Sequence, residues 1–428
     1  MFTRKSKLAL VAASIACLGV PASAHATNGY FAHGYGTKAK ALGGATAALP
    51  QDSLVVATNP AGLAFVGDRY DLGWEFFAPR RGYSITGSSA FNGAQGSEND
   101  FFIVPHGGIS VALPWDATFG MAAYGNGGMN TEYSNAVFGG VFGGSAPTGV
   151  DLLQGFVPLT YSQKVTKTSS LGVSVIYVYQ MFKAEGLQPF DLFASERPGY
   201  TTNNGYDHST GVGYKIGGQM DLFGGFTLAA AYQPKIDMTE FTRYSGLFAG
   251  WGDFDIPSNY VVGAAWKITP GFTAVFDYQR INYTDVPAVS NSSHILTTSP
   301  GLGDPNGPGF GWDDINVYKL GLQYAAGDWT WRAGWNHGEN PVYQEPGTKG
   351  EIMFNILAPG IIEDHLTLGF SVKINPTTEL SVSYMHGFKN SVSGANPDGS
   401  GGTPSFGGGT SEVQMSQNSF ELSLGGSF

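Results

Sequence analysis

The C-terminal segment Asn418–Phe428 constrains the fold of this chain more than any other stretch, because it alternates strictly and ends on an aromatic residue. Side chains of a strand point alternately to its two faces, so its apolar and polar residues fall on opposite sides. The apolar set is Phe420, Leu422, Leu424 and Phe428, and the polar set is Ser419, Glu421, Ser423 and Ser427. An open strand edge is not tolerated in lipid, whereas the last strand of a closed barrel pairs with the first. The segment therefore predicts a transmembrane β-barrel.

The composition is typical of alternating strands rather than of spanning helices. The chain has 63 glycines, 14% aromatic and 13% charged residues, and its mean hydropathy is −0.06. Beyond the first 26 residues no stretch approaches the roughly 20 apolar residues of a spanning helix. The formal net charge is −11, which argues against a nucleic-acid partner.

Residues 1–26 have the layout of a secretory signal peptide. Arg4, Lys5 and Lys7 precede a short apolar run, and small residues follow it. Cleavage is expected after Ala24 or Ala26, which removes these three positive charges. The only cysteine, Cys17, lies in this segment, so disulfides and cysteine metal sites are excluded from the mature chain.

Short and long connections alternate along the remaining chain. Short turns are predicted at 114–117, 166–169, 224–225, 269–271, 326–328 and 375–377. Long segments rich in Gly, Asn, Ser and Pro are predicted near 81–100, 127–153, 184–208, 235–257, 283–313, 337–363 and 388–416. Six turns and seven loops predict fourteen antiparallel strands over residues 70–428, with both ends of the barrel chain on the periplasmic side.

Residues 27–69 do not alternate and are predicted to form a plug, here called the hatch, inside the barrel. They carry little charge and many small or apolar residues, which makes a floppy tail less favourable. Asp52 is placed to cap a short helix over Ser53–Thr58.

The hatch carries the sequence signs of a known family. Thr27–Phe31, the run Gly43-Gly44-Ala45 and the motif Asn59-Pro60-Ala61 before the first strand resemble the FadL/TodX family of outer-membrane transporters for hydrophobic compounds. The resemblance implies a hatch with Asn59, Pro60 and Ala61 near its base. It also implies a kinked third strand that opens the wall sideways.

The stretch that matches this kink contains Gly125, Asn126, Gly127 and Gly128. Glycines within a strand favour bulges and broken pairing. The alternative is that Gly127 and Gly128 begin the next loop, and both interpretations stay open.

Two of the long loops are rich in apolar side chains. In the family the third and fourth loops form a ligand groove, and the matching residues here are Leu187, Phe190, Leu192, Phe193, Phe241, Leu247, Phe248, Trp251 and Phe254. So many exposed aromatics are costly in water unless they bind something or pack together. A groove and a cap over the barrel are compatible, and we expect both.

Cations of inward parity are candidates for binding a carboxylate. Lys319 and Arg332 are the first choices and Lys215 the third. The alternative is that they pair across the lumen or hold the hatch.

The sequence contains no arrangement of side chains that predicts catalysis, so we expect no enzyme, no cofactor and no metal site. The predicted function is passive transport of long-chain fatty acids or hydrocarbons across the bacterial outer membrane. The expected partners are the hydrophobic ligand, outer-membrane lipid and lipopolysaccharide, and the barrel-assembly machinery through the C-terminal strand; nucleic acid is not expected, and a monomer is. A porin for polar solutes and a surface-binding or adhesion barrel are the alternatives. The substrate, the need for a carboxylate, the route of exit and the oligomeric state stay open.

Overall fold

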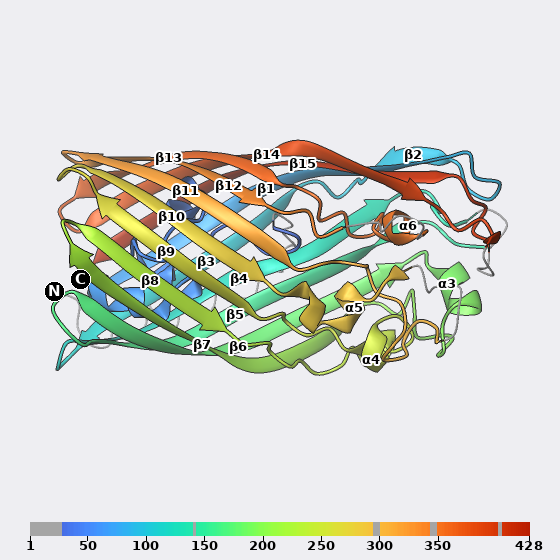
Figure 1. Cartoon of the computed structure of the whole chain (residues 1–428), viewed down its shortest axis with the longest axis horizontal. Coiled ribbons are helices and arrows are strands. Elements are labelled where there is room, and N and C mark those ends of the chain that lie inside the picture. The colour runs from blue at the N-terminus through green and yellow to red at the C-terminus, as the bar shows by residue number, and fades with distance from the viewer. Residues whose placement is uncertain (1–27, 140–142, 294–299, 343–348, 401–404) are drawn as a thin grey trace.

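The computed structural model describes residues 28–139, 143–293, 300–342, 349–400 and 405–428, so the predicted signal peptide lies outside the described residues. The chain forms one closed antiparallel barrel in which each strand pairs with the next and the last pairs with the first (Figure 1). Fourteen strands make the wall, as predicted, and a fifteenth, β2, is a short addition to the outer end of β1.

The wall strands range in length from 8 to 18 residues, and the shortest of them lie in the second half of the chain. The strands are β1 Arg69–Thr86, β2 Gly93–Gly96, β3 Phe102–Leu113, β4 Ala117–Tyr133, β5 Thr148–Lys164, β6 Ser169–Glu185, β7 Asp207–Phe223, β8 Phe226–Gln233, β9 Asn259–Lys267, β10 Phe272–Ile281, β11 Ile315–Ala326, β12 Trp329–Gly338, β13 Asp364–Asn375, β14 Thr378–Ala395 and β15 Thr410–Ser427. The long loops gather at one end of the barrel and carry the short helices α3 Gln188–Phe193, η5 Thr242–Tyr244, α4 Ala249–Gly252, η6 Tyr283–Asp285, α5 Pro287–Ser290 and α6 Glu351–Phe354.

Alternation places apolar residues outside and polar residues inside the wall. On β15, Phe420 is 44% exposed on the outer face, whereas Glu421 is 1% exposed inside. β15 pairs with β1 from Arg69–Ser427 to Thr86–Thr410, which confirms the predicted closure. In the part of the chain that the structure describes, no helix is long and apolar enough to cross a membrane.

Several strands extend further than the sequence pattern predicted. β4 continues to Tyr133, so the interpretation that Gly127 and Gly128 begin a loop is wrong. β1 runs to Thr86, and β14 runs to Ala395 before β15 resumes at Thr410. These segments are polar or glycine-rich and do not alternate clearly, but their neighbours supply the hydrogen bonds that keep them extended.

The hatch lies inside the barrel at the end away from the long loops (Figure 1). It contains α2 Thr37–Ala41, η2 Ser53–Ala57 and η3 Pro60–Phe65. Asp52 caps η2 by accepting a hydrogen bond of 3.1 Å from the Leu54 amide, as predicted. Barrel side chains satisfy other backbone groups of the hatch: Asp277 accepts from the Thr46 and Ala47 amides at 2.9 Å, and Asp71 accepts from the Ser53 amide at 2.9 Å.

A lysine of the hatch bridges the seam of the barrel. Glu75 of β1 and Glu421 of β15 face each other directly in the register, and both are buried. Lys40 of α2 donates to Glu75 and lies 2.8 Å from a Glu421 carboxylate oxygen. Two buried carboxylates in direct opposition repel unless a cation lies between them. The Lys40 ammonium therefore joins hatch docking to barrel closure.

We expect the substitution Lys40→Ala to loosen both the hatch and the seam. Breaking a buried ion pair costs about 3–5 kcal/mol because it leaves charge uncompensated. In detergent, the midpoint of thermal unfolding should fall and protease should cut the hatch faster.

The matched control is the neutral triple variant Lys40→Met, Glu75→Gln and Glu421→Gln, which removes all three charges and should recover most of the stability. A Lys40→Ala protein with the midpoint and protease resistance of the unaltered chain would contradict this role of the bridge.

Candidate functional site

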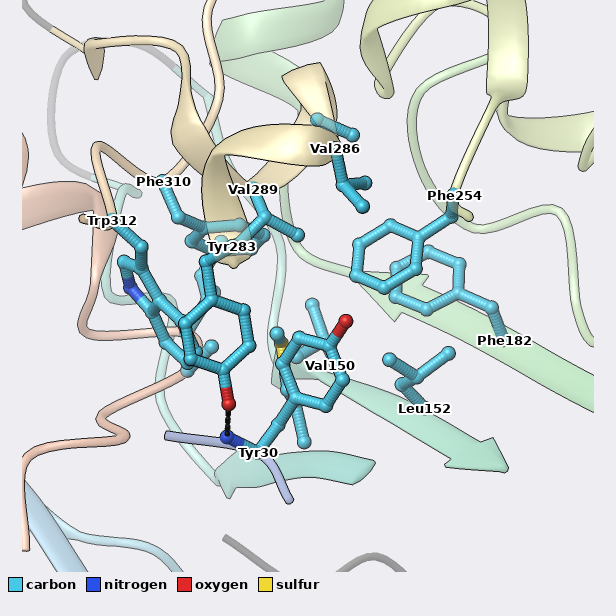
Figure 2. Packing of buried hydrophobic residues seen from close by; sticks show 14 of the residues in the cluster. Tyr30, Val150, Leu152, Phe182, Phe254, Tyr283, Val286, Val289, Phe310 and Trp312 are labelled. Atoms are coloured by element: carbon cyan, nitrogen blue, oxygen red, sulfur yellow. Dashed lines mark hydrogen bonds between the residues drawn. The ribbon is translucent and has the colours of Figure 1, made fainter. Parts of the chain in front are cut away.

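A continuous apolar cluster runs from the outer loops down the lumen to the tip of the hatch, residues 28–31 (Figure 2). The rings of Phe182 on β6 and Phe248 in the loop after β8 lie 4.6 Å apart, and Phe248 and Phe254 lie 4.9 Å apart. Phe254 in turn lies 6.1 Å from Tyr30 of the hatch. Aromatic rings at these separations attract each other beyond their burial. The cluster forms an apolar path that is closed in this state.

The predicted groove residues divide between a buried core and an exposed rim. Leu187, Phe190, Phe241, Leu247, Phe248 and Phe254 are buried in the cluster. Leu192 and Phe193 of α3 are 65% and 69% exposed. Most of these loop side chains therefore pack together as a cap over the barrel.

Trp251 lies beside an open hollow of about 570 Å³ between the loops that follow β6 and β8. Its backbone has a φ of 64°, a left-handed conformation that is rare for a residue with a bulky side chain. The Arg197 guanidinium lies 4.1 Å from its ring centre and holds it by a cation–π contact.

The tip of the hatch is anchored where β4 is irregular. The register of β4 against β5 shifts between Gly125 and Gly127. There the Gly128 amide donates to the Tyr30 carbonyl at 3.1 Å, and the Ala32 amide donates to the Asn126 carbonyl at 2.9 Å. Gly127 has to be glycine, because a Cβ at this position would lie 1.7 Å from the Tyr30 carbonyl oxygen. The bulge in β4 is thus the docking place of the hatch tip.

Tyr283, in the loop between β10 and β11, holds the hatch tip from the side of the outer loops. Tyr283 accepts a hydrogen bond from the Tyr30 amide at 3.2 Å (Figure 2). Its hydroxyl donates to the Asn28 carbonyl at 2.6 Å. Trp312 packs against both rings, 5.3 Å from Tyr283 and 5.9 Å from Tyr30. These contacts tie the hatch tip to the loop between β10 and β11.

A chain of buried side-chain amides connects the bulge to an outer loop. Tyr35 of the hatch donates to Asn126 at 2.8 Å, and Asn126 donates to Gln154 at 3.4 Å. Gln154 donates to Gln180 at 2.9 Å, and Gln180 donates to the Phe254 carbonyl at 2.8 Å. Each link occupies a polar group that would otherwise be buried without a partner. This chain of hydrogen bonds connects the backbone of Phe254 to Tyr35 of the hatch.

Two small cavities interrupt the cluster. One, of about 10 Å³, lies among Phe182, Leu247, Phe248 and Phe310 beneath the loops. The other, also about 10 Å³, lies beside the hatch tip and is lined by Phe77, Arg81, Met129, Trp312, Pro359, Met415 and their neighbours. Each has room for about one water molecule, so passage of a larger solute requires rearrangement.

Arg81 is the only cation that lines this inner cavity among the described residues. It is 6% exposed and donates to the backbone carbonyls of Asn130 and Asn99. Within the described residues it has no ion pair with a carboxylate, and its Nε has no hydrogen-bond partner. A guanidinium beside an apolar cavity with spare donors is suited to an anionic group on an apolar molecule.

The three predicted carboxylate-binding residues lie elsewhere, against the hatch or its contacts. Lys215 donates to the Ala57 carbonyl at 2.5 Å, and Arg332 donates to Gln51 at 2.9 Å. Lys319 faces Asp277 across the β10–β11 pair, and Asp277 holds hatch amides. Their arrangement matches the alternative of cations that hold the hatch.

The motif Asn59-Pro60-Ala61 lies against β5, β6 and β7 rather than against the β4 bulge. Asn59 caps η3 by accepting from the Ala61 amide at 3.0 Å, and its amide group donates to the Ala47 carbonyl at 2.9 Å. Ser170 of β6 donates to the Ala61 carbonyl at 2.7 Å. The motif fastens the base of the hatch to the wall.

Several residues of this site were missed at the sequence level, namely Arg81, Tyr283, Trp312, Gln154 and Gln180. Arg81 shares the inward parity of Glu75 and Phe77, but its position falls in the predicted loop 81–100 rather than in the first strand. The other residues lie in loops or look like ordinary lumen residues, and their sequence carries no signal. In the part of the chain that the structure describes, no group of three or more His, Cys, Asp or Glu residues is placed to hold a metal ion.

Two aspartates, Asp253 and Asp255, lie on either side of Phe254 in the loop between β8 and β9. Asp255 is buried and accepts from Lys235 at 2.6 Å and from the Met238 amide at 2.7 Å. Burial and the neighbouring Asp255 carboxylate raise the pKa of Asp253 to about 7. Asp253 therefore holds a proton in the folded loop under conditions where the unfolded chain has lost it.

We expect this loop to loosen as the pH rises from about 4 to about 7. In this window the folded loop binds more protons than the unfolded chain, so rising pH lowers its stability. The protection factors of residues 247–256, which are exchange rates corrected for the intrinsic dependence of amide exchange on pH, should be larger at pH 5 than at pH 8. Asp253→Asn should remove this difference, and an unchanged pH dependence in that variant would assign it to another group.

Sequence and structure comparisons identify relatives of this chain. A profile of the family described as "Outer membrane protein transport protein (OMPP1/FadL/TodX)" matches residues 12–419. No curated protein sequence matches the chain.

Solved structures from three bacteria illustrate the similarity in fold. The toluene transporter TodX of P. putida is 17% identical, with a TM-score of 0.66 over 92% of this chain and 99% of its own. A FadL homologue of Pseudomonas aeruginosa is 17% identical, with a TM-score of 0.68 over 94% and 100%. The toluene transporter TbuX of Ralstonia pickettii is 19% identical, with a TM-score of 0.61 over 92% and 99%. At these identities the likeness establishes the shared barrel fold.

Proposed function

This chain belongs to the OMPP1/FadL/TodX family of outer-membrane transport proteins, and from that membership we propose that it conducts hydrophobic molecules passively through its plugged lumen. The observation that carries the proposal is the continuous apolar cluster from the outer loops to the hatch tip. Lipopolysaccharide blocks direct entry of such molecules, and a water-filled pore offers them no favourable surroundings. An apolar path supplies about 25 cal/mol for each Å² of apolar surface that a solute buries.

Capture begins at the outer loops in this proposal. The exposed Leu192 and Phe193 of α3 provide apolar surface to the outside. Trp251 adds an aromatic ring to a hollow that is otherwise mostly polar. The buried rings of Phe248 and Phe254 lead inward from there. A solute that enters between these rings displaces Phe254 and thereby strains the amide chain that ends on Tyr35 of the hatch.

Release follows when the hatch tip leaves the β4 bulge. The tip is held by backbone hydrogen bonds to β4 and by Tyr283, and it lies beside the inner cavity. Departure of Tyr30 and Phe31 would free backbone groups of Asn126 and Gly128 and open the irregular part of the wall. Lateral exit near Gly125–Gly128 is therefore the route that we propose.

We expect Gly127→Ala to raise the rate of hydrophobic uptake, because the added Cβ displaces the Tyr30 carbonyl and with it the hatch tip. Uptake of labelled toluene and labelled oleate is measured in cells that lack other transporters for these compounds. Gly155→Ala on β5 is the matched control, since its Cβ meets its nearest neighbour at an ordinary 3.9 Å.

The unaltered protein should take up the hydrophobic compounds and leave a labelled sugar at the level of cells without it. Sugar uptake as fast as hydrophobic uptake would favour a polar porin, and no uptake of either would favour an adhesion barrel. A correctly folded Gly127→Ala protein with normal uptake would rule out release through the hatch tip.

Arg81 is our candidate for deciding between fatty acids and hydrocarbons. Its guanidinium lines the inner cavity and has no carboxylate partner among the described residues. A ligand carboxylate in the cavity would therefore accept hydrogen bonds from its spare donors and neutralise its charge. A hydrogen bond to a charged group contributes about 1.5–3 kcal/mol, or roughly a tenfold to hundredfold change in affinity.

We expect Arg81→Met to weaken oleate binding by about this factor and to leave toluene binding unchanged. Arg80→Met, on the exposed outer face of the same strand, is the matched control. Binding is measured by calorimetry on the purified proteins. Equal loss for both ligands would assign Arg81 a purely structural role.

A further inference from the structure

The outer wall of the barrel has a large apolar groove on the side where the hatch motif is fastened. The groove has a volume of about 590 Å³ and is lined by Leu171, Gly172, Ile216, Gly217, Gly218, Ala230, Ala231, Tyr232, Tyr260, Val261 and Val262 of strands β6 to β9. We call it the wall groove. Its volume lies within the range of small-molecule sites, although it opens to the outside of the barrel rather than to the lumen.

The strand register explains why the wall is hollow here. Leu171, Gly218, Ala230 and Val262 form one row across the four strands, each directly opposite the next. The two central residues of this row are small: Gly218 has no side chain, and Ala230 has only a methyl group. The next row, Val173, Ile216, Tyr232 and Tyr260, carries large side chains, as do Met220 and Leu228 on the other side. Large residues on both sides of Gly218 and Ala230 form the rims of the groove.

The inner face of the same wall is equally bare and is covered by the hatch motif. A Cβ on Gly172 would lie 2.4 Å from the Pro60 carbonyl carbon, and one on Gly217 would lie 2.1 Å from Asn59 Oδ1. The Asn59 amide group donates to the Gly218 carbonyl at 3.3 Å. At Gly217 and Gly218 a single layer of backbone therefore separates the groove from the motif.

We propose that the wall groove binds an acyl chain of an outer-membrane lipid and that the bound chain stabilises the docked Asn59-Pro60-Ala61 motif. The groove is continuous with the membrane-facing surface, where Leu171, Ile216 and Val262 are about half exposed. An acyl chain is linear and apolar, as the groove is, and it is the molecule that surrounds this face. Tyr232 and Tyr260 line the rim of the groove near the ends of β8 and β9 that lead into the long loops. Tyrosines of membrane barrels are enriched where the membrane meets water.

A transported molecule is a poorer occupant because the wall between the lumen and the groove is intact. Around Gly217 and Gly218 the register of β7 continues without a shift against both β6 and β8. The bound chain orders Gly218, whose carbonyl receives the Asn59 hydrogen bond. Occupancy outside the wall is thus coupled to hatch docking inside it, whichever molecules cross the lumen.

The test uses Ala230→Leu, which fills the groove from outside and does not reach the hatch. Ala333→Leu is the matched control, because it adds the same bulk on the outer face of β12, away from the groove. Native mass spectrometry counts the palmitoyl-oleoyl phosphatidylethanolamine molecules that stay bound as detergent is stripped. The unaltered protein and Ala333→Leu should retain a lipid that Ala230→Leu loses.

Hydrogen exchange in the motif gives a second measurement, made on each protein in detergent and in vesicles of the same lipid. Addition of lipid at about ten times its dissociation constant should slow exchange of residues 59–65 about tenfold in the unaltered protein and in Ala333→Leu. Ala230→Leu should show no response to lipid. Equal lipid retention and equal response in all three proteins would overturn the proposal. Displacement of the retained lipid by toluene or oleate would also overturn it, because the groove would then belong to the transported molecules.

Discussion

The pairing of β15 with β1 is the interaction on which the rest of this structure depends. In lipid an unpaired strand edge is too costly to persist, so every other strand is held in place only if this seam closes. The seam itself would be destabilised by repulsion between two carboxylates, since the buried Glu75 and Glu421 face each other inside it. Lys40 of the hatch offsets this repulsion by bridging both carboxylates. The hatch is therefore a structural part of the barrel and more than a stopper placed in it.

The hatch is attached in two different ways at its two ends. Its base is held by charged and polar side chains of the wall, such as Asp71, Asp277 and Lys215. Its tip is held by a few backbone hydrogen bonds at the β4 bulge, by Tyr283 and by apolar packing. In the transport mechanism that we propose, a hydrophobic solute displaces the tip rather than the base, since it competes for the apolar surface that the tip buries.

Sequence patterns predicted the barrel well because its wall repeats one rule. Residues such as Phe420 and Glu421 alternate, and the alternation follows from strand geometry alone. The same rule predicted that Lys215, Lys319 and Arg332 point into the lumen, but it could not predict which groups each of them contacts. Arg81 was missed because residues 81–100 were predicted to be a loop, whereas pairing with β15 extends β1 to Thr86. The loop aromatics were found by composition, but which of them are buried depends on how separate loops fold over each other.

The sequence by itself determined the strand count, the sidedness of each strand, the cap of η2 by Asp52 and the family, because each depends on residues close together in the chain. Tertiary structure alone decided the contacts between distant segments. It placed Lys40 between Glu75 and Glu421, Tyr283 against the hatch tip and Asn59 behind Gly217 and Gly218. These contacts join residues that lie tens to hundreds of positions apart, and one sequence carries no periodic signal of such meetings. The transport mechanism that we propose depends on these contacts, since they decide where the hatch is held.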